Sequence, residues 1–203
     1  MSDLEARLDA LVRTTVVPAL KPQGYAKRKL SWVRAGDGMA HWIILQRSHG
    51  NTPDHLRFYV EVAAYSAEFA AAVGGTVPDD LTKGVAQYRV RFEEVCDWPG
   101  QWVDLESWSD EDLARAFGVA LEQLDTHLAA ITDARSLAAA MAAGSSGLDL
   151  DLFAWSCAND DQAAIAEQLA TAEANFGAEE RWPRLRAQFD RVAQRFGVSL
   201  AAQ

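Results

Sequence analysis

Cysteine is scarce in this sequence: Cys96 and Cys157 are the only two in 203 residues. Two cysteines so far apart do not form the disulfide framework on which small secreted domains depend. The chain also lacks an apolar run that approaches the roughly 20 residues needed to cross a bilayer. Its first residues, MSDLEARLDALVR, show neither the basic start nor the apolar stretch of a signal peptide. Together these features predict a cytoplasmic protein that does not insert into a membrane.

Positive charge is in short supply. The chain has 19 lysines and arginines against 29 aspartates and glutamates, which gives a formal net charge of −10. Proteins that bind nucleic acid or anionic membranes concentrate positive charge on a broad surface. The sequence therefore predicts neither of these partners, and it leaves room only for a local cationic patch.

Catalytic and metal-binding motifs are missing as well. The sequence has no Gly-x-Ser-x-Gly motif, and the glycine pair at 74–75 lacks the Gly-Lys-Ser/Thr of a phosphate loop. His49 and His55 flank a predicted loop and could approach each other, but the chain has no HExxH or CxxC spacing. We therefore predict no catalytic residues, no metal site and no cofactor.

The sequence does contain three strand-like segments, at 25–34, 40–48 and 56–65, with Gly-rich or Pro-containing breaks between them. The third segment alternates most clearly. Its apolar side chains Leu56, Phe58, Val60 and Val62 point one way, and its polar side chains Arg57, Tyr59 and Glu61 point the other. This alternation is typical of an antiparallel sheet with one apolar and one polar face.

Further strands are predicted at 85–95 and 101–106. Apolar residues at helical spacing predict helices at 3–20, 110–131, 159–176 and 179–196, and an alanine-rich run predicts one at 133–143. Residues 148–158 alternate like a strand, but we predict a helix there because the segment lies among helices. We therefore predict an α+β fold: an antiparallel sheet of four or five strands, packed by the N-terminal helix and the long helix from Asp110. The Gly-Ser run at 144–147 predicts a boundary between a sheet domain, 1–143, and a helical C-terminal extension, 148–203, that packs on it as one compact unit.

The polar sides of the third and fourth predicted strands form the single candidate site. If these strands pair or neighbour each other, the polar residues at 57–61 and at 89–93 lie on one face, although the sequence does not fix their register. The first strand adds either Lys27 and Lys29 or else Arg28 and Arg34. We predict that the residues that bind a ligand or partner are Arg57, Tyr59, Glu61, Arg89, Arg91, Lys27, Lys29, Gln46 and Ser48.

Two interpretations of this face are open. Arginines beside a tyrosine and a glutamate can recognise a carboxylate or phosphate through paired hydrogen bonds. Alternatively, the face is a solvated surface on which cross-strand ion pairs contribute little each. The basic residues at 27–29 have a similar second explanation, because charge on an edge strand prevents unwanted strand pairing.

Several short motifs resemble an uncharacterised bacterial family, domain of unknown function 4304. The resemblance spans residues 5–140, and its motifs occur in the family's order: Gly24-Tyr25-Ala26-Lys27-Arg28 with Trp32, Ile43-Ile44-Leu45-Gln46-Arg47-Ser48, Arg57-Phe58-Tyr59-Val60, and Arg89-Val90-Arg91-Phe92 with Trp102. Glu93 departs from the family pattern, which has a glycine there. The resemblance implies a bacterial, soluble α+β domain, and it supplies no catalytic residues because the family has no established activity.

The leading hypothesis is a non-enzymatic binding or protein-interaction module. One version is an acidic, immunity-like protein that neutralises a basic toxin, because complementary charge would speed such an association. The alternative is binding or turnover of a small anionic ligand on the arginine-rich face. A third hypothesis is a structural subunit of a homo-oligomer.

Overall fold

The structure, a computed structural model, describes residues 2–200 and divides into two compact units. The first, which we call the sheet unit, contains the chain up to Ser66 together with Pro78–Thr132. The second, the helical unit, contains Ala67–Val77 and the chain from Asp133 onward. The Gly-Ser run at 144–147 thus lies inside the helical unit, and the division into 1–143 and 148–203 stays a prediction.

The sheet unit is built on one six-stranded antiparallel sheet, which confirms the α+β fold. Its strands follow the order β1-β2-β3-β4-β5, and β6 pairs with β4 on the edge that β5 also uses. The predicted strand at 25–34 forms two strands, because the chain turns at Lys29, whose φ is 58°. The strands are β1 Ala26–Arg28, β2 Ser31–Gly36, β3 Met39–Arg47, β4 Arg57–Ser66, β5 Tyr88–Arg91 and β6 Val103–Asp104.

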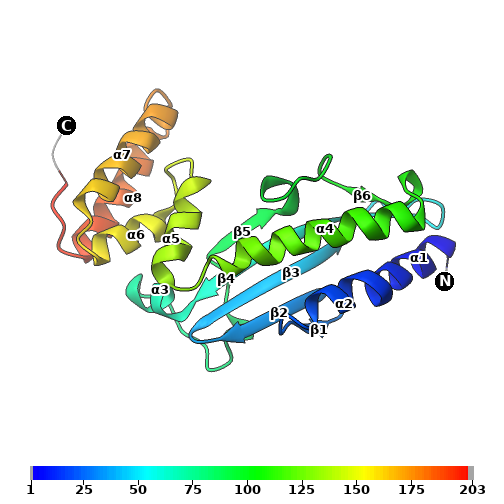
Figure 1. The fold of residues 1–203 in the computed structure, drawn as a ribbon. Helices are drawn as coiled ribbons and strands as arrows, with labels where there is room; N and C mark the ends of the chain where they lie inside the picture. The colour runs from blue at the N-terminus through cyan, green and yellow to red at the C-terminus, as the bar shows by residue number, and fades with distance from the viewer. Residues whose placement is uncertain (1, 201–203) are drawn as a thin grey trace. The chain divides into compact units, whose positions relative to one another are not determined.

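Helices cover one face of this sheet. Figure 1 shows the N-terminal helical stretch, α1 Asp3–Leu11 to α2 Val17–Leu20, and the long helix α4 Asp110–Ala129 over the same face. A π-helical turn, Val12–Val16, joins α1 to α2. Ser2 and Glu5 form a capping box at α1, and Ser109 caps α4. The predicted packing of the sheet on these helices is confirmed.

We call this side of the sheet the helix-covered face. From β4, the side chains of Phe58, Val60 and Val62 point into it and are fully buried. The ring of Phe58 meets Phe117 of α4 edge-on, with ring centroids 5.8 Å apart. Burying each such side chain contributes about 1.5–3 kcal/mol, so this face forms the main core of the unit.

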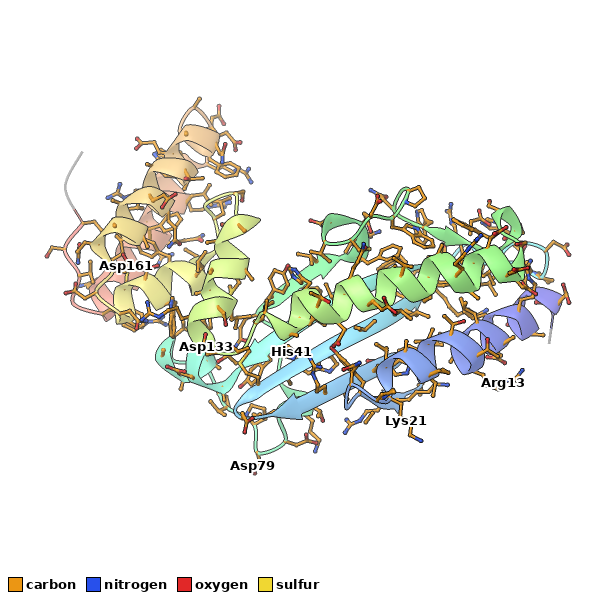
Figure 2. All side chains as sticks on the ribbon, viewed as in Figure 1. Arg13, Lys21, His41, Asp79, Asp133 and Asp161 are labelled. Carbon is orange, nitrogen blue, oxygen red and sulfur yellow. The ribbon has the colours of Figure 1, made fainter. Side chains whose placement is uncertain are left out.

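Polar groups on the helix-covered face are bonded to the helices or to the chain that follows them. Arg34 lies 3.0 Å from Asp125 of α4, and Arg47 lies 3.1 Å from Glu5 of α1. His41 Nε2 donates to the carbonyl oxygen of Ile131, just beyond α4, at 2.9 Å (Figure 2). These contacts fix the helices against the strands.

The opposite face, which we call the open face, is covered only at one end within the sheet unit. Residues 78–87, with the short 3-10 helix Leu81–Lys83, lie over Tyr65 at the end of β4. A Cβ atom at Gly84 would lie 2.9 Å from the Tyr65 ring, so this close approach needs glycine. The remainder of the open face carries six of the nine predicted site residues: Gln46, Arg57, Tyr59, Glu61, Arg89 and Arg91.

The helical unit contains α3 Ala67–Ala72, α5 Ala134–Ala143, α6 Leu150–Ala158, α7 Gln162–Phe176 and α8 Trp182–Arg195. Its core gathers apolar residues from α6, α7 and α8, with Phe153 and Phe189 in edge-to-face contact at 4.9 Å. The helical character of the C-terminal part, predicted from its periodicity, is confirmed. Within residues 2–200, no helix is both long and apolar enough to cross a membrane.

Candidate binding face on the open side of the sheet

Strand register brings the predicted polar residues together on the open face. Tyr59 of β4 pairs with Gln46 of β3, and Glu61 pairs with Arg91 of β5. Directly paired residues of antiparallel strands point to the same side of the sheet. We call the resulting surface the cationic face, and it consists of Gln46, Arg57, Tyr59, Glu61, Arg89, Arg91 and Trp102.

Two arginines of the cationic face are stacked on aromatic rings. The Cζ atom of Arg57 lies 4.5 Å from the centroid of the Trp102 ring, and that of Arg91 lies 4.1 Å from the Tyr59 ring. The Tyr59 and Trp102 rings meet edge-on at 5.3 Å. A guanidinium stacked on an exposed ring gains about 0.5–1 kcal/mol, and the stacking fixes the plane of its N–H groups.

The third arginine of the face has an acidic partner. Arg89 Nη1 donates to Glu61 Oε2 at 2.9 Å, and the Arg89 side chain remains 54% exposed. An ion pair with one exposed partner contributes about 0–1 kcal/mol, so this contact mainly orients the two side chains. Arg57 and Arg91 form no ion pair within residues 2–200.

Some N–H donors of the stacked arginines have no acceptor in the described part of the chain. Arg57 Nε and Arg91 Nη1 are buried and make no hydrogen bond there. A buried donor without a partner costs about 1–3 kcal/mol. Because both atoms are buried, an external acceptor reaches them only if the side chains rearrange, and the face offers a partner the charge of the two guanidinium groups.

Apolar side chains border the cationic face. Trp42 pairs with Ala63 and Ile44 pairs with Glu61, so both project from β3 onto the open face, where they are half-buried. The sequence predicts only that the apolar run around Trp42 and Ile44 forms part of a strand. The alternation within that run, which places Trp42, Ile44 and Gln46 on one side, is the signal that could have assigned both apolar side chains to the open face.

The other predicted site residues lie elsewhere. Lys27 pairs with Trp32 and points to the opposite face, with its Nζ 5.9 Å from the Trp32 ring, so it does not join the cationic face. Lys29 lies in the turn between β1 and β2. Ser48 follows β3, and its Oγ accepts a hydrogen bond from the backbone N–H of Gly50 at 3.2 Å.

The alternative pair from the first predicted strand is divided between the two faces. Arg28 pairs with Ser31 and lies on the open side, whereas Arg34 lies on the helix-covered face with Asp125. Among the basic residues Lys27, Arg28, Lys29 and Arg34, only Arg28 therefore lies on the same side of the sheet as the cationic face. The turn at Lys29 explains this division, because it reverses the chain in the middle of the predicted strand.

A second polar cluster lies beside the cationic face. His55, Asp104 and Glu106 bring one ligand atom each to within 4.8 Å of one another. Nδ1 of His55 lies 2.7 Å from Glu106 Oε1, and the backbone N–H of Leu56 donates to Glu106 Oε2 at 3.2 Å. Burial would by itself raise the pKa of Glu106, but hydrogen bonds from Asp104, the backbone and His55 lower it to about 2. Burial and the hydrogen bond to Glu106 raise the pKa of Asp104.

A third feature is an open groove of about 810 Å³ between α4 and residues 94–97. Its walls include Cys96 and His127 as well as acidic side chains. Burial and the nearby Glu93 and Asp97 raise the pKa of the Cys96 thiol to about 11, so the thiol stays protonated at neutral pH. Nucleophilic cysteines have lowered pKa values, so the shift at Cys96 is opposite to that of an activated thiol.

Comparison with known protein families gives one match. The family model described as Domain of unknown function (DUF4304) matches residues 16–129, which is more than half of the chain. The match begins at the last residue of the π-helical turn, ends at the last residue of α4 and includes every residue of the cationic face. No curated protein and no solved structure matches the chain significantly.

Proposed function

Because the chain belongs to the DUF4304 family, whose function is unknown, we propose a role from the site itself: a non-enzymatic protein that binds acidic groups of a protein partner on its cationic face. The observation that carries this proposal is the pair of guanidinium groups held against aromatic rings, Arg57 on Trp102 and Arg91 on Tyr59.

The stacked geometry suits carboxylate recognition. An arginine whose planar face lies on a ring keeps the edge of that plane for hydrogen bonds, and a carboxylate accepts two parallel bonds from such an edge. Neither guanidinium group forms an ion pair within residues 2–200, so both charges are left for an external carboxylate. Stacking also limits the side-chain entropy that binding would otherwise remove.

The surroundings of the arginines favour a protein partner over a small anion. Arginine, tyrosine and tryptophan are the residue types most enriched at the centres of protein interfaces, and half-buried Trp42 and Ile44 add apolar contact area beside them. Small ligands instead bind in concave pockets. The groove described above is lined by other residues, on α4 and at 94–97.

Charge gives the proposed interaction selectivity. The whole chain carries a net charge of −10, so a uniformly acidic partner is repelled at long range. A partner with acidic groups clustered on an otherwise neutral or basic surface meets attraction at the cationic face and little repulsion elsewhere. We therefore expect a specific partner rather than general binding of polyanions.

The test is affinity capture from the source cells followed by a quantitative binding assay with each captured protein. The Arg57→Ala/Arg91→Ala variant is compared with wild type and with Arg13→Ala/Lys21→Ala, which removes the same charge from the N-terminal helical region (Figure 2). We expect the partner to bind wild type and the control but not the first variant. A partner that binds all three proteins equally would refute the proposal.

Native mass spectrometry of the same three proteins separates the alternative function. A small added mass on wild type and on the control, absent from Arg57→Ala/Arg91→Ala, would identify a small anionic ligand as the occupant of the cationic face. That result would replace the protein partner in the proposal.

A further inference from the structure

We propose that His55, Asp104 and Glu106 form a binding site for a divalent transition-metal ion, with Zn²⁺ as the ion that fits the ligands best. The proposal does not depend on the function proposed for the cationic face. It rests on the convergence of the three side chains and on the finding that, within residues 2–200, neither carboxylate forms an ion pair with a lysine or arginine.

The first observation is geometric. The Nδ1 or Nε2 atom of His55 and one oxygen each of Asp104 and Glu106 all lie within 4.8 Å of one another. Zinc binds nitrogen and oxygen ligands at about 2.0–2.2 Å, so two ligands of one ion lie at most about 4.4 Å apart. Small side-chain rotations therefore bring all three groups onto one ion.

The fold fixes these ligands in place. Arg57 pairs with Asp104 between β4 and β6, and the backbone N–H of Leu105 donates to the carbonyl oxygen of Leu56 at 3.0 Å. Backbone N–H groups also hold the carboxylates: Leu56 donates to Glu106, and Glu106 donates to Asp104, both at 3.2 Å. Hydrogen bonds of this kind orient metal ligands in known sites.

The second observation is a missing counter-charge. Within residues 2–200, neither Asp104 nor Glu106 forms an ion pair with a lysine or arginine, although Arg57 is the strand partner of Asp104, and the imidazole of His55 lies 2.7 Å from Glu106. Two carboxylates placed side by side repel each other when both are ionised. A bound divalent cation would compensate both charges at once.

The ligand types select among metals. Magnesium and calcium prefer sites made of oxygen ligands alone, whereas imidazole together with carboxylates suits zinc and its first-row neighbours. Three protein ligands leave a coordination position for water or for an exogenous group. The side chains of His55 and Glu106 are 37% and 33% exposed, so an ion can reach the site from solvent.

The experiment is calorimetric titration of the metal-free protein with ZnCl₂, and with MgCl₂ for comparison. We expect one Zn²⁺ ion per chain, with Mg²⁺ bound at least 100-fold more weakly. His55→Asn and Asp104→Asn should each weaken Zn²⁺ binding about 10- to 100-fold or more, because each removes one of three ligands, and outer-shell partners alone are worth about that much. The matched control is His49→Asn, since His49 is an exposed histidine of the neighbouring loop.

Two further measurements keep the test decisive. Thermal unfolding of each metal-free variant verifies that it folds, and Zn²⁺ should raise the unfolding temperature of wild type and of His49→Asn only. Co²⁺ bound in place of Zn²⁺ should give visible absorption bands that both ligand variants lose. Wild type without stoichiometric Zn²⁺ binding, or Zn²⁺ binding that survives both His55→Asn and Asp104→Asn in folded protein, would overturn the proposal.

Discussion

Arginines lie on both faces of the same sheet, but the two faces hold them differently. On the helix-covered face, Arg34 and Arg47 each contact a carboxylate of a packed helix, at 3.0 and 3.1 Å. On the open face, the guanidinium groups of Arg57 and Arg91 lie on aromatic rings and form no ion pair within residues 2–200. The charges of the first pair are thus neutralised within the fold, whereas those of the second pair remain available to a partner.

The largest contrast between the faces should appear in stability. Phe58 and Tyr59 are neighbours on β4, but Phe58 is fully buried and Tyr59 is half-buried. Phe58→Ala should lower the free energy of unfolding by about 3–5 kcal/mol, because it leaves a cavity in the core. Tyr59→Ala should cost about 1–2 kcal/mol, which is the range for losing partly exposed packing. Urea unfolding of both variants measures the difference, and equal losses would contradict the assignment of the two faces.

The next effect concerns binding. Arg57→Ala/Arg91→Ala should weaken binding of the partner about 10- to 100-fold or more, because hot-spot truncations typically cost about 1.4–3 kcal/mol of binding free energy. Arg34→Ala/Arg47→Ala removes the same charge and should leave the partner's affinity unchanged within about twofold. Calorimetry or surface plasmon resonance with the captured partner makes the comparison. Similar losses in both double variants would show that net charge, not position, determines binding.

Acidification should affect the helix-covered face specifically. Burial lowers the pKa of His41, on that face, and of His127, whose Nε2 lies 2.8 Å from the hydroxyl of Tyr88. Both histidines therefore bind a proton more readily in the unfolded chain, where the pKa is about 6.5. The contribution of both histidines to the free energy of unfolding should be fully present above that pH. It should fall as the pH drops below it, by at most about 1.4 kcal/mol per pH unit for each histidine.

Unfolding midpoints in urea at pH 7.5, 6.5 and 5.5 measure this dependence. His127→Gln keeps a side chain that can bond Tyr88 but removes one titrating group, so its stability should vary less over the same range. A stability that rises on acidification would mean that these histidines are charged in the folded protein.

The smallest effect is expected at the exposed end of the helix-covered face. Arg47 and Glu5 are 43% and 40% exposed, so their ion pair should contribute little to stability and weaken as salt is added. A double-mutant cycle with Arg47→Met and Glu5→Gln, measured at low and at high salt, tests this expectation. A coupling energy that matches the loss caused by Tyr59→Ala and does not change with salt would show that exposed pairs also hold the helices in place.

The sequence predicts the faces of β4 well, because alternation of Phe58 and Val60 with Arg57 and Tyr59 needs no knowledge of the partner strands. The helices are predicted equally well from their apolar spacing and their caps. The register of the strands cannot be predicted in this way, because the pairing of Glu61 with Arg91 joins strands about 30 residues apart in the chain. The stacking of Arg57 on Trp102 therefore could not be predicted from the sequence.

Two features of the site escaped prediction for physical reasons. Lys29 adopts a left-handed conformation in a turn that lacks the usual glycine or asparagine, so the chain reversal there gave no recognisable signal. The cluster of His55 with Asp104 and Glu106 joins segments about 50 residues apart, and no spacing rule describes ligands brought together by strand pairing. Both the position of Lys27 and the candidate metal site follow from tertiary structure.

The alternation of β4 has a consequence for how this family can change over evolutionary time. One inserted or deleted residue within the strand would exchange its two sides, bringing Arg57 and Tyr59 into the core and Phe58 out of it. Changes in length should therefore accumulate in the connections, such as residues 48–56 and 92–102, while the strand keeps its length. New binding preferences in relatives would then arise by exchanging side chains on the open face, within a fixed frame of strands.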